Sequence, residues 1–98
     1  MAGFTFDAEL WISDTHRSVH FVNLPEPIAD EIDERFGDVA KGFGSQKVEV
    51  TIGRTTWSTS IFPSERSGTY VLPIKAVVRK AEGLEAGSTA RVSLVVVT

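Results

Sequence analysis

The sequence has no cysteine, which excludes disulfide bonds, thiolate nucleophiles and cysteine-ligated zinc sites. It also has no long apolar run, because the longest one, Leu94 to Val97, is far too short to cross a bilayer. The amino-terminal residues lack a basic region and include Asp7 and Glu9, which argues against a signal peptide. We therefore expect a cytoplasmic protein with no membrane partner.

Positive charge is also scarce. The chain has 10 lysine and arginine residues against 13 aspartate and glutamate residues, which gives a net charge of −3. Proteins dedicated to nucleic acids usually carry a dense patch of positive charge, so nucleic acid is not the partner that we expect. The remaining composition, with 42% hydrophobic and 23% charged residues, is typical of one folded domain, here spanning residues 1–98.

Alternating apolar and polar residues predict about six strands. They cover residues 4–13, 18–24, 47–53, 55–63, 69–73 and 90–97. Ile12 is expected on the inward face of the first strand. The last strand is apolar on both faces near its end, so we expect it to be paired along both edges or covered. The residues expected to be buried are Phe6, Leu10, Val48, Val50, Ile52, Val92 and Leu94.

Two short helices are predicted as well. The first is closed by Gly37, and its apolar stripe consists of Ile28, Ile32 and Phe36. The second runs from Ile74 to about Glu82, ends at Gly83, and is expected to bury Ile74, Val77, Val78 and Ala81. Hairpin-linked strands with two helices predict a mainly β fold, a small antiparallel β-barrel whose openings are capped by the helices.

One group of residues stands out as a candidate ligand site. Two aromatic rings, a hydroxyl and two cations fall in a short span around the strand–proline–helix turn, and they are Trp57, Ser60, Tyr70, Lys75 and Arg79. Lys75 and Arg79 are one helical turn apart and could reach the same small anion. The alternative is that both side chains only cover apolar surface while their charged ends stay in water.

Other chemical signals are weak. Ser58, Ser60, His16 and His20 could be assembled into a catalytic triad on paper, but the sequence has no nucleophile elbow. His16 and His20 are four residues apart, yet one lies in a predicted turn and the other on a strand, so they do not form a helical metal pair. The glycine loop at residues 41–47 precedes a strand and not a helix, which does not favour a phosphate cradle. We expect no cofactor, no metal and no catalytic residue.

The second half of the chain, "VEVTIGRTTWSTSIFP…GTYVLPIKAVVRKAEGLEAG", with "HFVNLP" upstream, resembles the DUF1905 family of small prokaryotic proteins of unknown function. The resemblance covers nearly the whole chain. It implies a double-split β-barrel, the fold class also used by transcription factors of the AbrB and MazE type. Arg54 and Ser88 depart from the family pattern at turns, and Val19 stands where a tryptophan is common.

These observations lead to a hypothesis and two alternatives. We expect a small β-barrel protein, a binding protein rather than an enzyme, that holds a small anionic or aromatic ligand near Lys75 and Arg79 and exists as a monomer or weak homodimer. The first alternative is a nucleic-acid-binding regulator of the AbrB type, although a shared fold does not carry function with it. The second is an uncharacterised hydrolase or isomerase.

Overall fold

The computed structural model describes residues 3–15, 18–36 and 44–97. Three features of the sequence analysis fall outside these residues: the predicted helix end at Gly37, His16, and residues 41–43 of the glycine loop. Among the described residues there are seven strands and two helices. The strands are β1 (Gly3–Glu9), β2 (Trp11–Ile12), β3 (His20–Asn23), β4 (Gln46–Ile52), β5 (Thr55–Ser64), β6 (Thr69–Pro73) and β7 (Thr89–Val96). The helices are α1 (Glu26–Phe36) and α2 (Ala76–Glu82).

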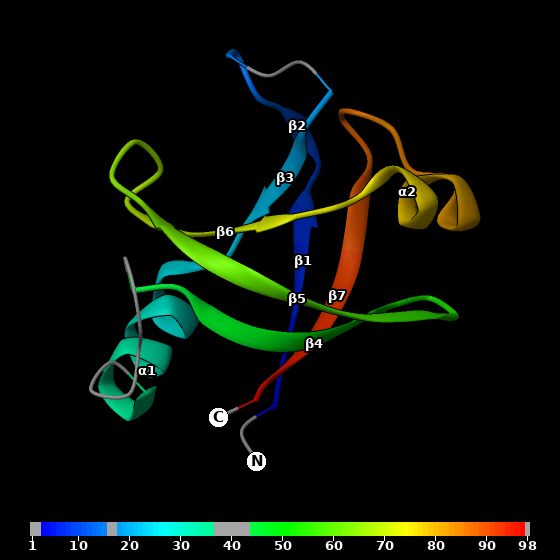
Figure 1. The fold of residues 1–98 in the computed structure, drawn as a ribbon. Helices are drawn as coiled ribbons and strands as arrows, with labels where there is room; N and C mark the ends of the chain where they lie inside the picture. Colours follow the sequence, from blue (N-terminus) through cyan, green and yellow to red (C-terminus); the bar gives the residue numbers. More distant parts are fainter. Residues whose placement is uncertain (1–2, 16–17, 37–43, 98) are drawn as a thin grey trace.

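The strands form one antiparallel sheet in the order β1-β7-β4-β5-β6-β3-β2. The two ends of this order, β1 and β2, are separated in the chain by Leu10 alone, so the sheet must curl until its two ends meet. Figure 1 shows the resulting half-barrel, with α1 and α2 at opposite ends of it. The prediction of a mainly β, barrel-like fold with two helices is therefore confirmed. Neither of the helices described is long and apolar enough to cross a membrane.

The first predicted strand is broken at Leu10, which is why seven strands are found and not six. The backbone N–H of Leu10 donates to the carbonyl of Ser88 at 2.8 Å, and its own carbonyl accepts from the N–H of Gly87 at 2.8 Å. These bonds take Leu10 out of the pairing between β1 and β7 and turn the chain towards β3. Beyond the break Ile12 is 37% exposed, so its predicted inward position is wrong.

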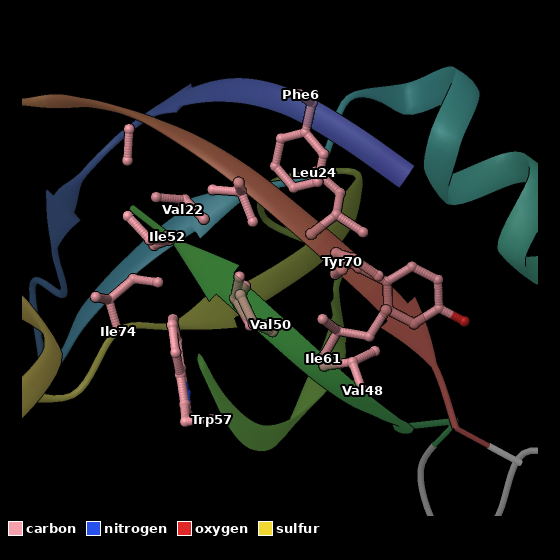
Figure 2. Close-up of a cluster of buried hydrophobic side chains, with 14 of the residues drawn as sticks. Phe6, Val22, Leu24, Val48, Val50, Ile52, Trp57, Ile61, Tyr70 and Ile74 are labelled. Atoms are coloured by element: carbon pink, nitrogen blue, oxygen red, sulfur yellow. The ribbon is translucent and has the colours of Figure 1, made fainter. Parts of the chain in front are cut away.

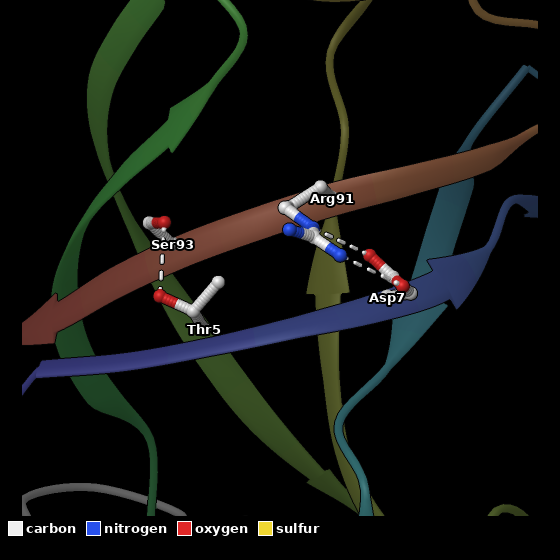
Figure 3. Close-up of polar contacts among 4 residues, drawn as sticks. All are labelled: Thr5, Asp7, Arg91 and Ser93. Atoms are coloured by element: carbon white, nitrogen blue, oxygen red, sulfur yellow. Dashed lines mark hydrogen bonds and ion pairs between the residues drawn. The ribbon is translucent and has the colours of Figure 1, made fainter.

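Before the break at Leu10, β1 pairs with β7 along its whole length. On the outer face of this pair Thr5 hydrogen-bonds Ser93, and the Arg91 guanidinium binds the carboxylate of Asp7 (Figure 3). Hydrogen bonding and charge attraction from Arg91 hold the pKa of Asp7 below its ordinary value. Because this ion pair is exposed, it contributes little to stability.

The core lies inside the curl of the sheet (Figure 2). All seven strand residues predicted to be buried are at most 7% exposed, which confirms the strand registers. β7 is paired with β1 on one edge and with β4 on the other, as predicted for a strand that is apolar on both faces. From α1, Ala29 and Ile32 are buried, while Ile28 and Phe36 pack partly buried against the same cluster.

The second helix is shorter and less buried than predicted. It begins at Ala76 and buries only Val78, while Val77 is 71% exposed and Ala81 is also exposed. Ile74 is buried, but it precedes the helix. A helix of seven residues that lies on the edge of the sheet has room for one inward side chain, so the predicted burial of Val77 and Ala81 is wrong. The predicted end at Gly83 is confirmed by its left-handed φ of 64°.

Candidate functional site

The long strand β5 changes partner along its length, and this change creates the candidate site. Thr55–Ile61 pair with β4, whereas Phe62–Ser64 pair with β6. Figure 1 shows β5 and β6 side by side at one end and separating towards α2. A pocket of about 370 Å³ opens where they separate. Its lining consists of Ser18, Val19, His20, Trp57, Ser58, Thr59, Pro73, Ile74, Lys75, Ala76 and Arg79.

Arg79 is held in position at this pocket by two hydrogen bonds. Its Nε donates to the carbonyl of Ile74 at 3.1 Å, and its Nη1 lies 3.2 Å from Nε2 of His20. Because a guanidinium can only donate, His20 must accept through Nε2 and carry its proton on Nδ1. Nδ1 lies 3.4 Å from the carbonyl of Ser18, where that proton can be donated. Of the five N–H groups of Arg79, three have no partner among the residues that the structure describes.

Two further residues that carry hydrogen-bond donors line the same pocket. Lys75 is exposed, and its ammonium makes no ion pair or hydrogen bond with the residues that the structure describes. Trp57 is only 8% exposed, and within the described ranges its indole N–H has no hydrogen-bond acceptor. Trp57 lines the pocket, so we regard its indole N–H as a candidate donor to a ligand.

The electrostatics of the pocket differ from those of the whole chain. No carboxylate is among the lining residues, although the chain as a whole has a net charge of −3. The lining combines Lys75 and Arg79 with Trp57, Ser58 and Thr59. Such a set of donors can hold a carboxylate, phosphate or sulfate group. No cluster of His, Asp and Glu suitable for a metal ion occurs among the described residues.

Of the five residues predicted as a site, three lie together at this pocket: Trp57, Lys75 and Arg79. Ser60 faces the outer side of β5, where it lines a separate hollow with Lys47, Phe62 and Val97.

Tyr70 lies at the other end of β6, where its hydroxyl donates to Oδ1 of Asp33 at 2.6 Å. Burial, and then the hydrogen bond and charge of Asp33, raise the pKa of Tyr70 to about 12, although a hydrogen bond from Gln46 opposes the shift. This contact ties α1 to the sheet. The hollow that Tyr70 lines is acidic, since Asp30, Asp33 and Glu65 also line it.

Sequence reasoning missed the part played by His20, which it interpreted as a half-buried strand histidine. His20 and Arg79 are 59 positions apart in the chain, and the contact exists only because β3 pairs with the end of β6. Sequence reasoning also omitted Ser58 and Thr59 from the site. Their signal was available, because they are the two residues that follow Trp57 on the same strand.

The fold and the pocket together define a class of protein: a small antiparallel half-barrel with a cationic pocket where two of its strands separate. A family model described as a domain of unknown function (DUF1905) matches residues 6–94, nearly the whole chain. The chain therefore belongs to the DUF1905 family, as the resemblance of its second half predicted. A comparison with curated proteins finds no match.

Proposed function

We propose that this protein binds a small organic anion in the pocket between β3, β5 and α2, and that it acts as a binding protein and not as an enzyme. The observation that carries the proposal is that Lys75, Arg79 and Trp57 line one pocket whose lining residues include no carboxylate. Apolar lining from Val19, Pro73 and the neighbouring residues suits a ligand with an apolar body next to its charged group.

The two cations contribute in different ways. Arg79 is already ordered by Ile74 and His20, so a bound anion need not immobilise it. Lys75 is free to move towards the anion, and its loss should not disturb the fold. Replacing Arg79 removes two hydrogen bonds as well as a charge, and should therefore lower the free energy of unfolding by about 1–3 kcal/mol.

The test uses the fluorescence of Trp57, which lines the pocket. Trp11 is the second tryptophan, and Trp11→Phe leaves Trp57 as the single reporter while keeping an aromatic ring against Phe21. Benzoate, phosphate and sulfate are titrated into this variant, and its melting temperature is recorded in parallel. We expect at least one anion to change the fluorescence in a saturable way, and to raise the stability by about 2.7 kcal/mol at a hundredfold excess over its Kd.

Lys75→Met provides the decisive comparison, with Lys80→Met as its matched control. Both lysines are exposed, and Lys80 lies on α2 outside the pocket. Lys75→Met should weaken anion binding about tenfold or more, whereas Lys80→Met should leave it within twofold. The absence of any anion response in the parent, or an equal loss in both variants, would contradict the proposal.

A further inference from the structure

His20 lies on β3 and lines the same pocket as the two cations. Its ring is half-buried, and both ring nitrogens have partners: Nε2 lies 3.2 Å from Nη1 of Arg79, and Nδ1 lies 3.4 Å from the carbonyl oxygen of Ser18. Histidine is the side chain whose charge ordinarily changes between pH 5 and pH 8. The residue that accepts a hydrogen bond from Arg79 is therefore also the residue of the pocket that can gain a proton near neutral pH.

A proton on Nε2 of His20 would change what this pair can bind. A protonated imidazole donates from both nitrogens and accepts from none, so Arg79 would lose one of its two acceptors. Two positively charged donors would then replace a donor and an acceptor whose nitrogens are 3.2 Å apart. Arg79 would still donate to the carbonyl of Ile74, which keeps the guanidinium at the pocket. The pair would then need an acceptor with a negative charge.

The other lining residues do not supply this negative charge. Lys75 and Arg79 are the other titratable side chains of the lining, and both are cations. From β2, the residue that pairs with His20 is Ile12, which is uncharged. The residues that β5 contributes are also uncharged, and they are Trp57, Ser58 and Thr59. A proton gained by His20 therefore adds a third positive charge to the lining.

Carboxylates on the neighbouring segments have partners elsewhere. Glu82, at the end of α2, accepts a hydrogen bond from Thr55 at 2.6 Å. Asp14, between β2 and β3, forms an ion pair with Arg66 at 2.6 Å. Neither carboxylate lines the pocket. Among the residues that the structure describes, no carboxylate is placed to accept from a protonated His20, so a bound anion would have to do so.

We propose that His20 is a ligand-binding residue that couples the pocket to protons: it holds Arg79 while neutral and donates to the bound anion when protonated, so that doubly charged anions are selected as the pH falls. This inference rests on the anion site proposed above and adds the charge class of its ligand. Linkage requires the coupling to be reciprocal, so anion binding must also draw a proton onto the protein.

The size of the coupling follows from the charges. Even at the dielectric constant of water, a unit charge about 4 Å from a singly charged anion changes the affinity about fivefold. The interaction energy is proportional to the charge of the ligand, so a doubly charged anion gains the square of that factor, about 25-fold. The ratio of the two gains therefore reports the charge of the preferred ligand.

Sulfate and methanesulfonate are suitable probes, because both have a tetrahedral head and keep their charges of −2 and −1 across the range from pH 8 to pH 5.5. Their Kd values are measured from the fluorescence of Trp57 in the Trp11→Phe variant at constant ionic strength. We expect the Kd of methanesulfonate to fall about fivefold from pH 8 to pH 5.5, and that of sulfate to fall about 25-fold. Equal gains for the two anions would refute the selection of doubly charged anions.

His20→Gln is the main variant, since a glutamine carbonyl can still accept from Arg79 but cannot gain a proton. His16→Gln is its matched control, because His16 is the other histidine of the chain. At pH 8 we expect His20→Gln to bind sulfate within about threefold of the parent, and to lose most of the gain at pH 5.5. His16→Gln should keep that gain. A gain that survives in His20→Gln would overturn the proposal.

Proton uptake provides a measurement that does not depend on the His20 variant, should that variant fail to fold. Calorimetric titration of the unmodified protein with sulfate at pH 6.5, in buffers of different ionisation enthalpy, gives the number of protons taken up on binding. We expect a positive fraction of a proton, and the same fraction in His16→Gln. Sulfate that binds without proton uptake would refute the role of His20 and leave the anion site standing. If neither anion binds at any pH, the anion site itself fails.

Discussion

Tyr70 is the single tyrosine of the chain, so its titration can be followed without interference from another phenol. Its ring is 5% exposed, and its hydroxyl donates to Asp33 on α1. Burial and the negative charge of Asp33 both disfavour the phenolate, and together they raise the pKa of Tyr70 to about 12. In the unfolded chain the same phenol should titrate near its ordinary pKa of about 10.

This difference makes stability depend on alkaline pH, with a defined sign. The folded pKa lies above the unfolded one, so the contribution of Tyr70 is fully present below pH 10. It is lost as the pH rises from 10 towards 12, because only the unfolded chain releases the proton in that range. A shift of this size corresponds to no more than about 2–3 kcal/mol at the alkaline end.

The assay is a spectrophotometric titration of the tyrosinate band, with circular dichroism at each pH to report the folded fraction. Asp33→Asn is the matched perturbation, since it keeps an acceptor for the hydroxyl and removes the charge. We expect the folded parent to titrate near pH 12, and the variant to titrate between that value and about pH 10. A folded parent that titrates near pH 10 would refute the argument, as would a variant with an unchanged midpoint.

Two further predictions concern stability. Val50→Ala should lower the free energy of unfolding by about 1–3 kcal/mol, measured by denaturant titration, because Val50 lies on β4 and is fully buried in the core. A loss below about 0.5 kcal/mol would contradict its place in the core. Gly53→Ala should cost about 1–2 kcal/mol, because the φ of Gly53 is 57° and an added Cβ would overlap the Glu82 carboxylate. A double-mutant cycle with Glu82→Ala separates the two costs, because this change removes the overlap but not the strain of a positive φ at residue 53. If the effects of the two substitutions on the free energy of unfolding are fully additive, the overlap contributes nothing.

The sequence allowed the strands to be predicted well, because a strand with one buried face repeats with a period of two. Val48, Val50 and Ile52 alternate with polar residues, and all three are buried. The break at Leu10 could not be predicted in this way, because the alternation continues through it to Ile12. The break depends on hydrogen bonds with Gly87 and Ser88, which are far away in the chain.

The burial of the second helix also could not be predicted from local sequence alone. The spacing of Ile74, Val77 and Val78 indicates an amphipathic helix, and a helix is found at Ala76–Glu82. Which residues of it are buried depends on how much of the sheet edge the helix contacts. The extent of this contact depends on where β5 and β6 separate. The spacing of apolar residues within the helix does not predict that point.

For the candidate site, part of the error could have been avoided. Trp57 and Ser60 are three positions apart on one strand, and side chains at an odd separation point to opposite faces. The strand prediction therefore already implied that the Ser60 side chain lies on the face of β5 opposite the Trp57 ring. Lys75 and Arg79 follow directly after the strand end at Pro73, and local geometry was enough to place them together. The contact with His20 required the pairing of β3 with β6.

The two prolines at the strand ends show how a short sequence can produce the split. Pro63 lies on β5 with its nitrogen on the side of β4, but pairing with β4 ends at Ile61, so the missing N–H removes no bond of this ladder. Pro73 lies on β6 with its nitrogen on the side of β5, next to Ser60, where an N–H would have extended the pairing. The first proline is therefore tolerated within a long strand, while the second ends the contact between β5 and β6. Because Lys75 follows Pro73 by two residues, the residue that opens the sheet also sets the position of the charge beside the opening.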